Sequence, residues 1–294
     1  MKKENLSEDD LDKLLSHLSG SARSPQGKYS ANESYPVLRK RMFGKTTKRF
    51  SFLRYAAAAA SVALIISLST YFFLDKSPEM ITVATTNNIE EITLPDESRV
   101  TLSRYSSLQY PSKFDNKSRN VTLVGEGYFD VAKDSVHAFI VHADNVNIKV
   151  LGTQFNVHSY PNDEYVKATL LEGAVSVSTT SNNNSTILKP NESAIFYKGS
   201  GNLQKETNYK ALDDVAWREG KLIFKDKTLS EIAGNLSNYF NLKIDVKSQK
   251  LRIYKITARF EQNESIEEIL NILQGAANFK WKHSGNTIII TSNP

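Results

Sequence analysis

The segment RKRMFGKTTKRFSFLRYAAAAASVALIISLSTYFFLD, residues 39–75, divides the chain into a short arm and a long second part. Its second half, Tyr55–Leu74, contains 20 residues without a charge, a proline or a glycine. A helix of that length covers about 30 Å, the thickness of the hydrocarbon layer of a bilayer. The segment therefore predicts a single membrane-spanning helix over residues 55–74.

Two other interpretations of this segment fit less well. A buried core helix of this length would carry a polar stripe, whereas the polar groups here are only serine, threonine and tyrosine hydroxyls. A cleaved signal peptide has a short charged region before about 7–15 apolar residues. Here more than fifty residues come first and no A-x-A site follows, which favours an uncleaved anchor.

The charges on either side of the segment predict its orientation. Residues 36–54 contain seven basic residues and no acidic one, whereas residues 75–91 contain a single basic residue, Lys76. Because Lys and Arg are retained on the cytoplasmic side, we expect residues 1–54 in the bacterial cytoplasm. Residues 75–294 would then lie in the periplasm, outside the inner membrane.

The overall basicity of the chain belongs to the arm. Residues 1–54 carry 12 basic and 6 acidic residues, net +6, and residues 75–294 carry 25 and 26, net −1. The large part therefore lacks the basic surface that direct nucleic-acid binding needs. The chain has no cysteine, which excludes disulfides and thiolate sites and favours a bacterial envelope protein.

The arm, residues 1–54, is predicted to begin with an amphipathic helix over residues 7–18 that Ser7 caps. Residues 20–36 are rich in serine, glycine and asparagine and are expected to be flexible. The helix folds on the membrane surface or docks a cytoplasmic protein, because its apolar face needs a partner. That face consists of four leucines: Leu11, Leu14, Leu15 and Leu18.

The second part of the chain is predicted to contain two domains. Residues 79–200 alternate in short β-branched and aromatic runs between turn residues, which is typical of an all-β sandwich or jelly-roll-like domain. Residues 201–216 are interpreted as a linker. Residues 217–294 then predict a small α+β domain of two β-α-β units, whose helices begin at the capping boxes Thr228/Glu231 and Ser265/Glu268.

No pattern in the sequence indicates an ordinary enzyme. The five histidines do not form a metal-binding motif, although His142 and Asp144 would share one face of a strand. Phosphate-binding, dinucleotide-binding and nucleophile-elbow motifs are not found. We therefore expect no catalytic residues toward an external substrate, no metal and no cofactor.

Five segments in the same order resemble the FecR-like anti-sigma regulators: LPDESRVTL, GEGYFDVAKD, FIVHADNVNIKVLGTQFNV, LLEGAVSV and LKPNESA. The later WREGKLIFKDKTLSEI resembles the C-terminal domain of these proteins in the Bacteroidetes, which is similar to the secretin/TonB short N-terminal fold. The resemblance covers about residues 79–294. It implies that the arm binds an extracytoplasmic-function sigma factor, and we expect the four leucines of the arm to face it. It also implies that the periplasmic part receives a signal from an outer-membrane TonB-dependent transporter.

The chain departs from the family pattern at three places. Glu97 follows Pro95-Asp96 where glycine is common, and Glu tolerates a positive φ less well than Gly. Asn191-Glu192 replaces the usual Gly-Gln after Pro190. The arm has one predicted helix and no tryptophan, whereas many relatives have a longer helical region that contains a tryptophan.

Gly152-Thr153 matches a step at which some family members cut their own backbone. The Thr hydroxyl would attack the preceding Gly carbonyl, and water would open the resulting ester. The alternative is that Gly152 forms a β-bulge and Thr153 packs on a strand.

A different class of function is a membrane-anchored envelope scaffold or glycan-binding module, with Trp217 or Trp281 stacking on sugars. Trp217 fits better at the domain junction, and Trp281 fits better in the core of the small domain. A periplasmic hydrolase lacks a recognisable set of residues.

Overall fold

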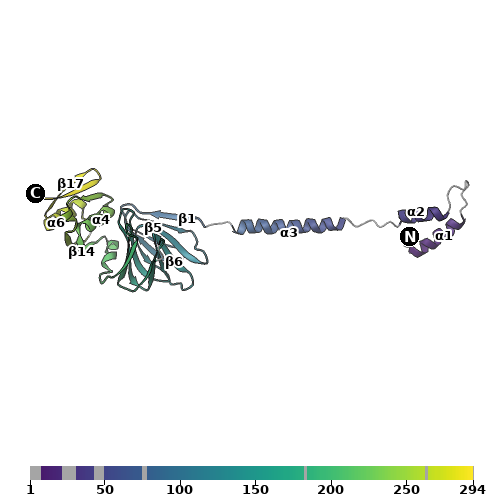
Figure 1. Ribbon diagram of the computed structural model, residues 1–294, viewed down its shortest axis with the longest axis horizontal. Helices are drawn as coiled ribbons and strands as arrows, with labels where there is room; N and C mark the ends of the chain where they lie inside the picture. Colours follow the sequence, from purple (N-terminus) through teal and green to yellow (C-terminus); the bar gives the residue numbers. More distant parts are fainter. Residues whose placement is uncertain are drawn as a thin grey trace. The chain divides into compact units, whose positions relative to one another are not determined.

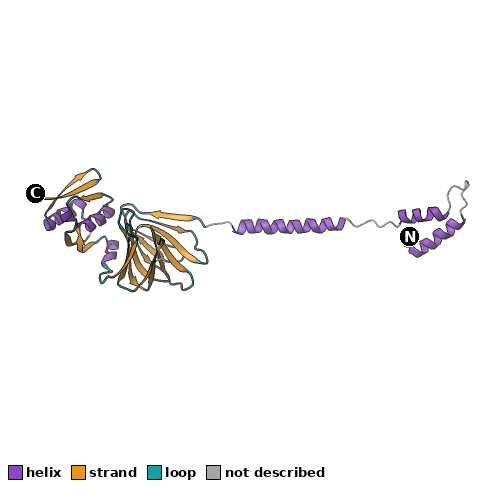
Figure 2. Cartoon of the chain, in the orientation of Figure 1, coloured by secondary structure: helices purple, strands orange, loops and turns teal. Residues whose placement is uncertain are grey.

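The computed structural model describes residues 8–21, 31–42, 50–74, 78–181, 184–261 and 264–293. They belong to two compact units, Met1–Lys76 and Ser77–Pro294 (Figure 1). The first unit is helical, and the second combines strands with a few short helices (Figure 2).

The N-terminal unit contains α1 (Glu8–Ser21), α2 (Ala31–Met42) and α3 (Phe50–Leu74). The helix expected at the start of the arm is confirmed as α1, while its predicted cap, Ser7, lies outside the described residues. The expectation of one flexible stretch over residues 20–36 is wrong for residues 31–36, which begin α2. Pro36 concealed this helix, because proline is disfavoured in a helix interior, yet α2 contains it.

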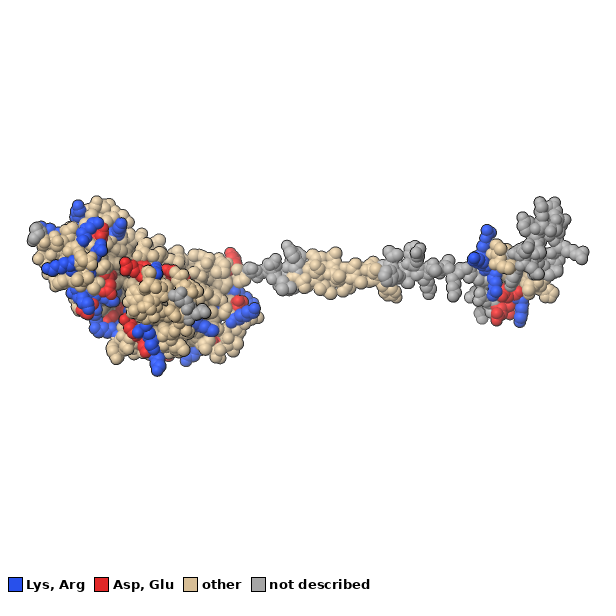
Figure 3. All heavy atoms as spheres, viewed as in Figure 1, with Lys and Arg blue, Asp and Glu red and all other residues tan. Residues whose placement is uncertain are grey.

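α3 covers the whole predicted span, and its described side chains, residues 55–70, are exposed and uncharged (Figure 3). Among the residues that the structure describes, no helix meets the length and hydropathy needed to cross a membrane. The predicted span at residues 55–74 is therefore not confirmed.

The first domain of the second unit is built from 13 strands in one continuous sheet, which we divide into two halves, sheet A and sheet B. Sheet A has the order β1 (Met80–Ala84), β4 (Ser107–Pro111), first half of β5 (Ser118–Asp130), β6 (Ala138–Ala143), β7 (Val146–Val150), β10 (Val175–Thr179) and β11 (Ser185–Leu188). Sheet B has the order β2 (Glu90–Thr93), β3 (Arg99–Leu102), second half of β5, β8 (Gln154–Ser159), β9 (Tyr165–Glu172), β12 (Glu192–Tyr197) and β13 (Asn202–Thr207).

Strand β5 belongs to both sheets. Its residues 118–122 pair with β6, and its residues 125–130 pair with β8. The change of sheet occurs at Gly125, which has φ +98° and where a Cβ would collide with Ser106. The predicted all-β domain is confirmed, but it is closer to a barrel than to two separate sheets. The β5–β6 pair is parallel, whereas the other strand pairs described in this domain are antiparallel.

The core of this domain, which we call the β-domain, lies between sheets A and B. Phe129 and Phe155 stack with ring centroids 5.0 Å apart, and Phe139 meets Phe129 edge-on at 6.2 Å. All three side chains are fully buried. They come from β5, β8 and β6, so this aromatic cluster joins the two sheets through their shared strand.

The predicted linker over residues 201–216 is wrong for residues 202–207, which form β13 and pair with β12. The strand was concealed by its polar sequence, because as an edge strand it is mostly exposed. A 3₁₀ helix, η1 (Asp213–Glu219), follows it and contains Trp217.

The C-terminal domain confirms the predicted α+β composition. Its elements are β14 (Leu222–Thr228), α4 (Leu229–Phe240), β15 (Lys243–Val246), α5 (Gln249–Arg252), β16 (Lys255–Phe260), α6 (Ile266–Ala277), β17 (Phe279–Ser284) and β18 (Thr287–Ser292). Both predicted capping boxes are formed, at Thr228/Glu231 and at Ser265/Glu268. The two strands around each helix do not pair with each other, however, because β14 pairs with β16 and β15 pairs with β18.

The turn in LPDESRVTL is fixed by the carboxylate of Asp96. Its two oxygens accept hydrogen bonds from the Ser98 amide, at 3.2 Å, and the Ser98 hydroxyl, at 2.7 Å. The buried Arg119 donates to the same carboxylate from sheet A, at 2.7 Å. Glu97, at the tip, is exposed and has φ +68°, the left-handed conformation that the sequence predicted to be unfavourable for it.

Glu97→Gly is expected to raise the free energy of unfolding by about 0.5–1 kcal/mol. The left-handed conformation costs an L-residue about 1–2 kcal/mol, and the greater freedom of glycine in the unfolded chain offsets part of the gain. Urea unfolding measures the change. The matched control is Asn191→Gly at φ +65°, where the gain should be smaller because asparagine tolerates this region. A Glu97→Gly protein no more stable than the parent would contradict the prediction.

Candidate functional site

The predicted leucine face lies on α1 and is only partly covered. Leu11 and Leu15 are half-buried, whereas Leu14 and Leu18 have exposed fractions of 51% and 59%. Helix α2 contacts α1 through an ion pair between Arg39 and Asp12 at 3.2 Å. The face therefore keeps apolar surface available for a further contact.

Gly152 and Thr153 lie immediately before β8, where two segments of the β-domain approach closely. Gly152 has φ +145°, and a Cβ there would lie 2.5 Å from Cγ of Lys133. Thr153 is 5% exposed, and its hydroxyl donates a hydrogen bond to the carbonyl of Ala174 at 3.1 Å. Its own carbonyl accepts from the Val131 amide at 3.1 Å. Only glycine fits the first position, and the Thr hydroxyl is held in the interior.

The surroundings of this step also contain an irregularity in strand pairing. The register between β8 and β9 shifts between Gln154 and Phe155, so that Leu171 has no direct partner. Gly173, with φ +96°, approaches the Thr153 hydroxyl so closely that a Cβ would lie 2.9 Å from it. The bulge is therefore next to the Gly-Thr step, and both interpretations of the step stay open.

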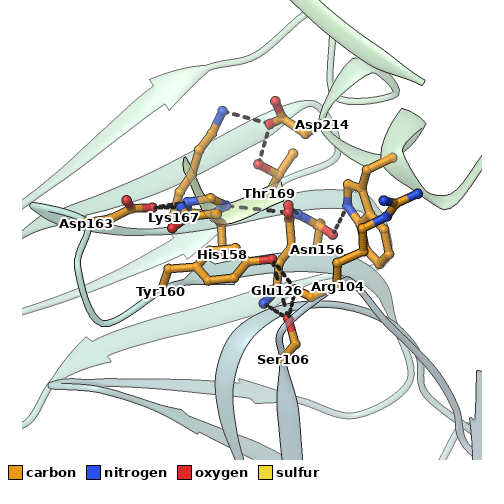
Figure 4. Close-up of polar contacts among 12 residues, drawn as sticks. Arg104, Ser106, Glu126, Asn156, His158, Tyr160, Asp163, Lys167, Thr169 and Asp214 are labelled. Atoms are coloured by element: carbon orange, nitrogen blue, oxygen red, sulfur yellow. Dashed lines mark hydrogen bonds and ion pairs between the residues drawn. The ribbon is translucent and has the colours of Figure 1, made fainter. Parts of the chain in front are cut away.

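A second polar site, which the sequence did not predict, lies on sheet B around His158 (Figure 4). The His158 Nε2 lies 2.6 Å from Oδ2 of Asp163, and its Nδ1 lies 3.5 Å from Oε2 of Glu126. The three side chains are between 10% and 14% exposed. The ring stacks on Tyr165 at 5.4 Å and meets Tyr160 edge-on at 5.1 Å.

This environment determines the charge of His158. Burial by itself lowers the pKa of the imidazole, but the charge of Glu126 and the hydrogen bond to Asp163 outweigh it and raise the pKa to about 9. His158 is therefore an imidazolium at neutral pH. Burial also raises the pKa of the Tyr160 and Tyr165 hydroxyls well above the ordinary value, so both stay neutral.

The carboxylate of Asp214, at the start of η1, forms the second half of this site. It accepts hydrogen bonds from Thr169 and Asn208, at 2.7 and 2.8 Å, and pairs with Lys167 at 2.7 Å. These contacts hold η1 against sheet B.

Asn156 extends the network to the indole of η1. Its amide donates to Glu126 at 2.9 Å, and its carbonyl accepts from the Trp217 indole at 3.3 Å. Because the charged groups of this site satisfy one another, the arrangement stabilises a junction instead of presenting a reactive group. Within the described ranges, no group of three His, Cys, Asp or Glu residues is placed to hold a metal ion.

The other predicted positions do not form a site together. The His142 ring bonds to Asn120 and Asn147, whereas Asp144 pairs with Lys198. Trp217 is 7% exposed and packs with Tyr128 and Val215 at the junction, as expected.

Trp281 packs partly buried against the core of the C-terminal domain, as the sequence predicted. With Trp217 buried and Trp281 packed in this way, neither indole stands out as an exposed platform for sugars.

Comparison with known proteins gives consistent matches over the second unit. The family model for FecR protein matches residues 81–176, and the model for the FecR C-terminal region matches residues 221–290. Two crystal structures of a candidate anti-sigma factor from Parabacteroides distasonis ATCC 8503 are similar, each with 26% sequence identity and a TM-score of 0.66. The matches cover 74% and 73% of this chain and 100% of those chains. No curated protein matches the sequence.

Proposed function

Because the chain belongs to the FecR family of anti-sigma regulators, we propose that its arm binds an extracytoplasmic-function sigma factor. Its second unit would receive the signal, through the C-terminal domain, from a TonB-dependent transporter in the outer membrane. The inducing signal would thus be converted into release or activation of the sigma factor.

The observation that carries this proposal is the order of the parts. A helical unit with a partly exposed leucine face comes first, and the FecR and FecR C-terminal domains follow in one compact unit. Such an apolar helix face is a common way to dock a partner protein. Its two exposed leucines are the natural contact points for a sigma factor.

The proposal includes a location in the bacterial inner membrane, with the arm in the cytoplasm and residues 75–294 in the periplasm. It is supported by the sequence of residues 55–74, which is long enough for a bilayer and has no charge. The seven basic residues between 36 and 54 support the cytoplasmic side for the arm.

The double substitution Leu14→Asp, Leu18→Asp is expected to reduce sigma-factor binding more than 100-fold, because two apolar anchors that would be buried at the interface are lost. The test is co-purification of the sigma factor with the full-length chain from cells of the source organism. A matched control is Lys13→Asp, Ser16→Asp, which changes the same helix outside the leucine face and should leave binding nearly unchanged.

Two outcomes would contradict this prediction. If both double variants recover the sigma factor equally, the leucine face is not the binding surface. If the intact wild-type chain recovers no sigma factor, the envelope scaffold or glycan-binding module becomes the better interpretation.

We also propose that the chain cuts itself between Gly152 and Thr153. The Thr153 oxygen would form a bond to the Gly152 carbonyl carbon as the peptide C–N bond breaks, leaving an ester and an amine that takes up the hydroxyl proton. Water would then hydrolyse the ester to a carboxylate and restore the hydroxyl. The positive φ of Gly152 and the held hydroxyl of Thr153 support this proposal.

Thr153→Ala is expected to leave the chain intact, whereas the wild type yields fragments 1–152 and 153–294. Mass spectrometry under denaturing conditions measures the two masses. Thr153→Ser keeps a hydroxyl nucleophile and should still be cut. Equal cutting of wild type and Thr153→Ala, or a wild type that is never cut, would show the proposal to be wrong.

A further inference from the structure

The segment that enters the C-terminal domain is fixed to the β-domain as far as the end of η1. Asp214 is held by three groups of sheet B and its flanking loop, as described above, and Trp217 is buried against Tyr128. The guanidinium of Arg218 lies over the Tyr128 ring at 3.8 Å. Residues 213–218 therefore move with sheet B.

The chain can pivot immediately after this anchored segment. Gly220 ends η1 in the left-handed conformation with φ +72°, and β14 begins two residues later at Leu222. Small residues at the end of an element are frequent positions for the backbone rotation of a hinge. Gly220 is thus the natural pivot between the two domains.

The apolar cores of the two domains are separate in the described residues. The cluster around Phe129 contains residues of the β-domain alone, and the cluster around Ile232 and Leu270 contains residues of the C-terminal domain alone. The third cluster joins only η1 to sheet B. Interfaces between domains that lack a large apolar contact open readily.

Beside the pivot, Lys225 of β14 pairs with Asp213 of η1 at 2.5 Å. Farther from Gly220, polar contacts of α4 hold the C-terminal domain against the β-domain. The Asn238 amide donates to Oδ2 of Asp163 at 2.8 Å, and the Arg104 guanidinium lies over the Tyr239 ring at 4.1 Å. Gly234 of α4 faces Asp163, and a Cβ there would make an ordinary van der Waals contact with Oδ1 of Asp163 at 3.9 Å. The same Asp163 oxygen binds His158 (Figure 4), so the interdomain contact rests on the buried cluster of sheet B.

The rest of the space between sheet B and α4 is not filled. A cavity of about 1420 Å³ lies there, lined by His158, Asp163 and Tyr165 on one side and by Gly234 and Asn238 on the other. A small number of contacts across a cavity stabilises one position of the domain without making it rigid.

We propose that the C-terminal domain is a hinged unit that pivots at Gly220 and is latched to the β-domain by Asn238–Asp163 and Arg104–Tyr239. In the latched position α4 covers the His158 cluster, and in the open position it does not. This device belongs to the chain itself and does not depend on the partners proposed above.

The test measures the distance between the domains in the full-length chain in detergent micelles. Because the chain has no cysteine, Val136→Cys and Ile272→Cys place two nitroxide labels, one on each domain. Both positions are well exposed, at 78% and 56%. Pulsed electron spin resonance then gives the distribution of distances.

Asn238→Ala and Arg104→Ala each remove one latch contact, and they lie in different domains. Each should raise the ratio of open to latched molecules roughly fivefold, the factor typical of one side-chain hydrogen bond or one cation–π contact, and the double variant should raise it further. Ser230→Ala on α4 and Arg99→Ala on β3 are the controls and should match the parent. One substitution lies in each domain, so misfolding of a single domain cannot explain the same increase of the open population in both variants. That shared increase therefore identifies the latch.

One distance in the parent and the same distance in the double variant would overturn the proposal, because the interface would then be rigid. A parent distribution that is already broad and that neither variant changes would overturn it as well, since these contacts would not hold the domain.

Discussion

Replacing Arg119 with methionine is expected to lower the free energy of unfolding of the β-domain by about 3–5 kcal/mol, the cost of removing one partner of a buried ion pair. The side chains of Arg119 and Asp96 are only 4% and 13% exposed, and they meet at 2.7 Å. Arg119 also donates to the carbonyls of Ala132 and His137, both at 3.0 Å. Methionine removes the donor to these two carbonyls and leaves the Asp96 carboxylate with only its hydrogen bonds from Ser98.

The measurement is urea unfolding followed by the fluorescence of Trp217, in a Trp281→Phe background that removes the other tryptophan. Trp217 packs on Tyr128 of sheet B and therefore reports on the β-domain. Arg99→Met is the matched control, because Arg99 pairs with Asp130 at 2.8 Å but is 62% exposed. An exposed pair contributes less than about 1 kcal/mol, and equal losses in the two variants would contradict the burial argument.

Raising the pH from 6 to 10 is expected to remove about 3 kcal/mol of stability through His158, at about 1.4 kcal/mol for each unit of pKa difference. The folded-state pKa is about 9, above the ordinary value of 6.5. Between these two pKa values His158 stays protonated in the folded chain but loses its proton in the unfolded chain. The contribution is therefore complete below about pH 6.5 and is lost as the pH rises through about 9.

His158→Gln separates this effect from other titrations, because glutamine keeps a donor toward Asp163 but does not ionise. Urea unfolding at several pH values should give a slope for the wild type in this window that the variant lacks. The same loss of stability in both proteins would show that His158 does not hold its proton as the two carboxylates predict.

The parts of the fold that local sequence determines were predictable. Both capping boxes of the C-terminal domain are formed because Thr228/Glu231 and Ser265/Glu268 bond within three residues. The strands of the β-domain follow from alternation, which a half-buried strand imposes. Helix α2 was missed because it contains a proline, which is disfavoured inside a helix. Strand β13 was missed because it is a mostly exposed edge strand, whose polar residues do not alternate with apolar ones.

The candidate sites also differ in whether their residues are close together in the sequence. The leucine face repeats at helical spacing, so the sequence predicts it. The His158 cluster could not be predicted, since Glu126 lies 32 residues before His158 and Asp214 lies 45 residues after Thr169. The pairing of β5, β8 and β9 brings Glu126 and Thr169 to the sheet around His158, and the docking of η1 on sheet B brings Asp214.

The sharing of β5 between the two sheets has a consequence for a chain cut at residues 152–153. Sheet A would join β5 and β7 from the first fragment to β10 from the second, and sheet B would join β5 to β8. The two pieces would remain one folded body, as in a split protein whose halves complement each other. Without an applied force, the paired strands would keep the two fragments associated. A pull on the C-terminal domain would separate the body along the β5–β8 and β7–β10 seams.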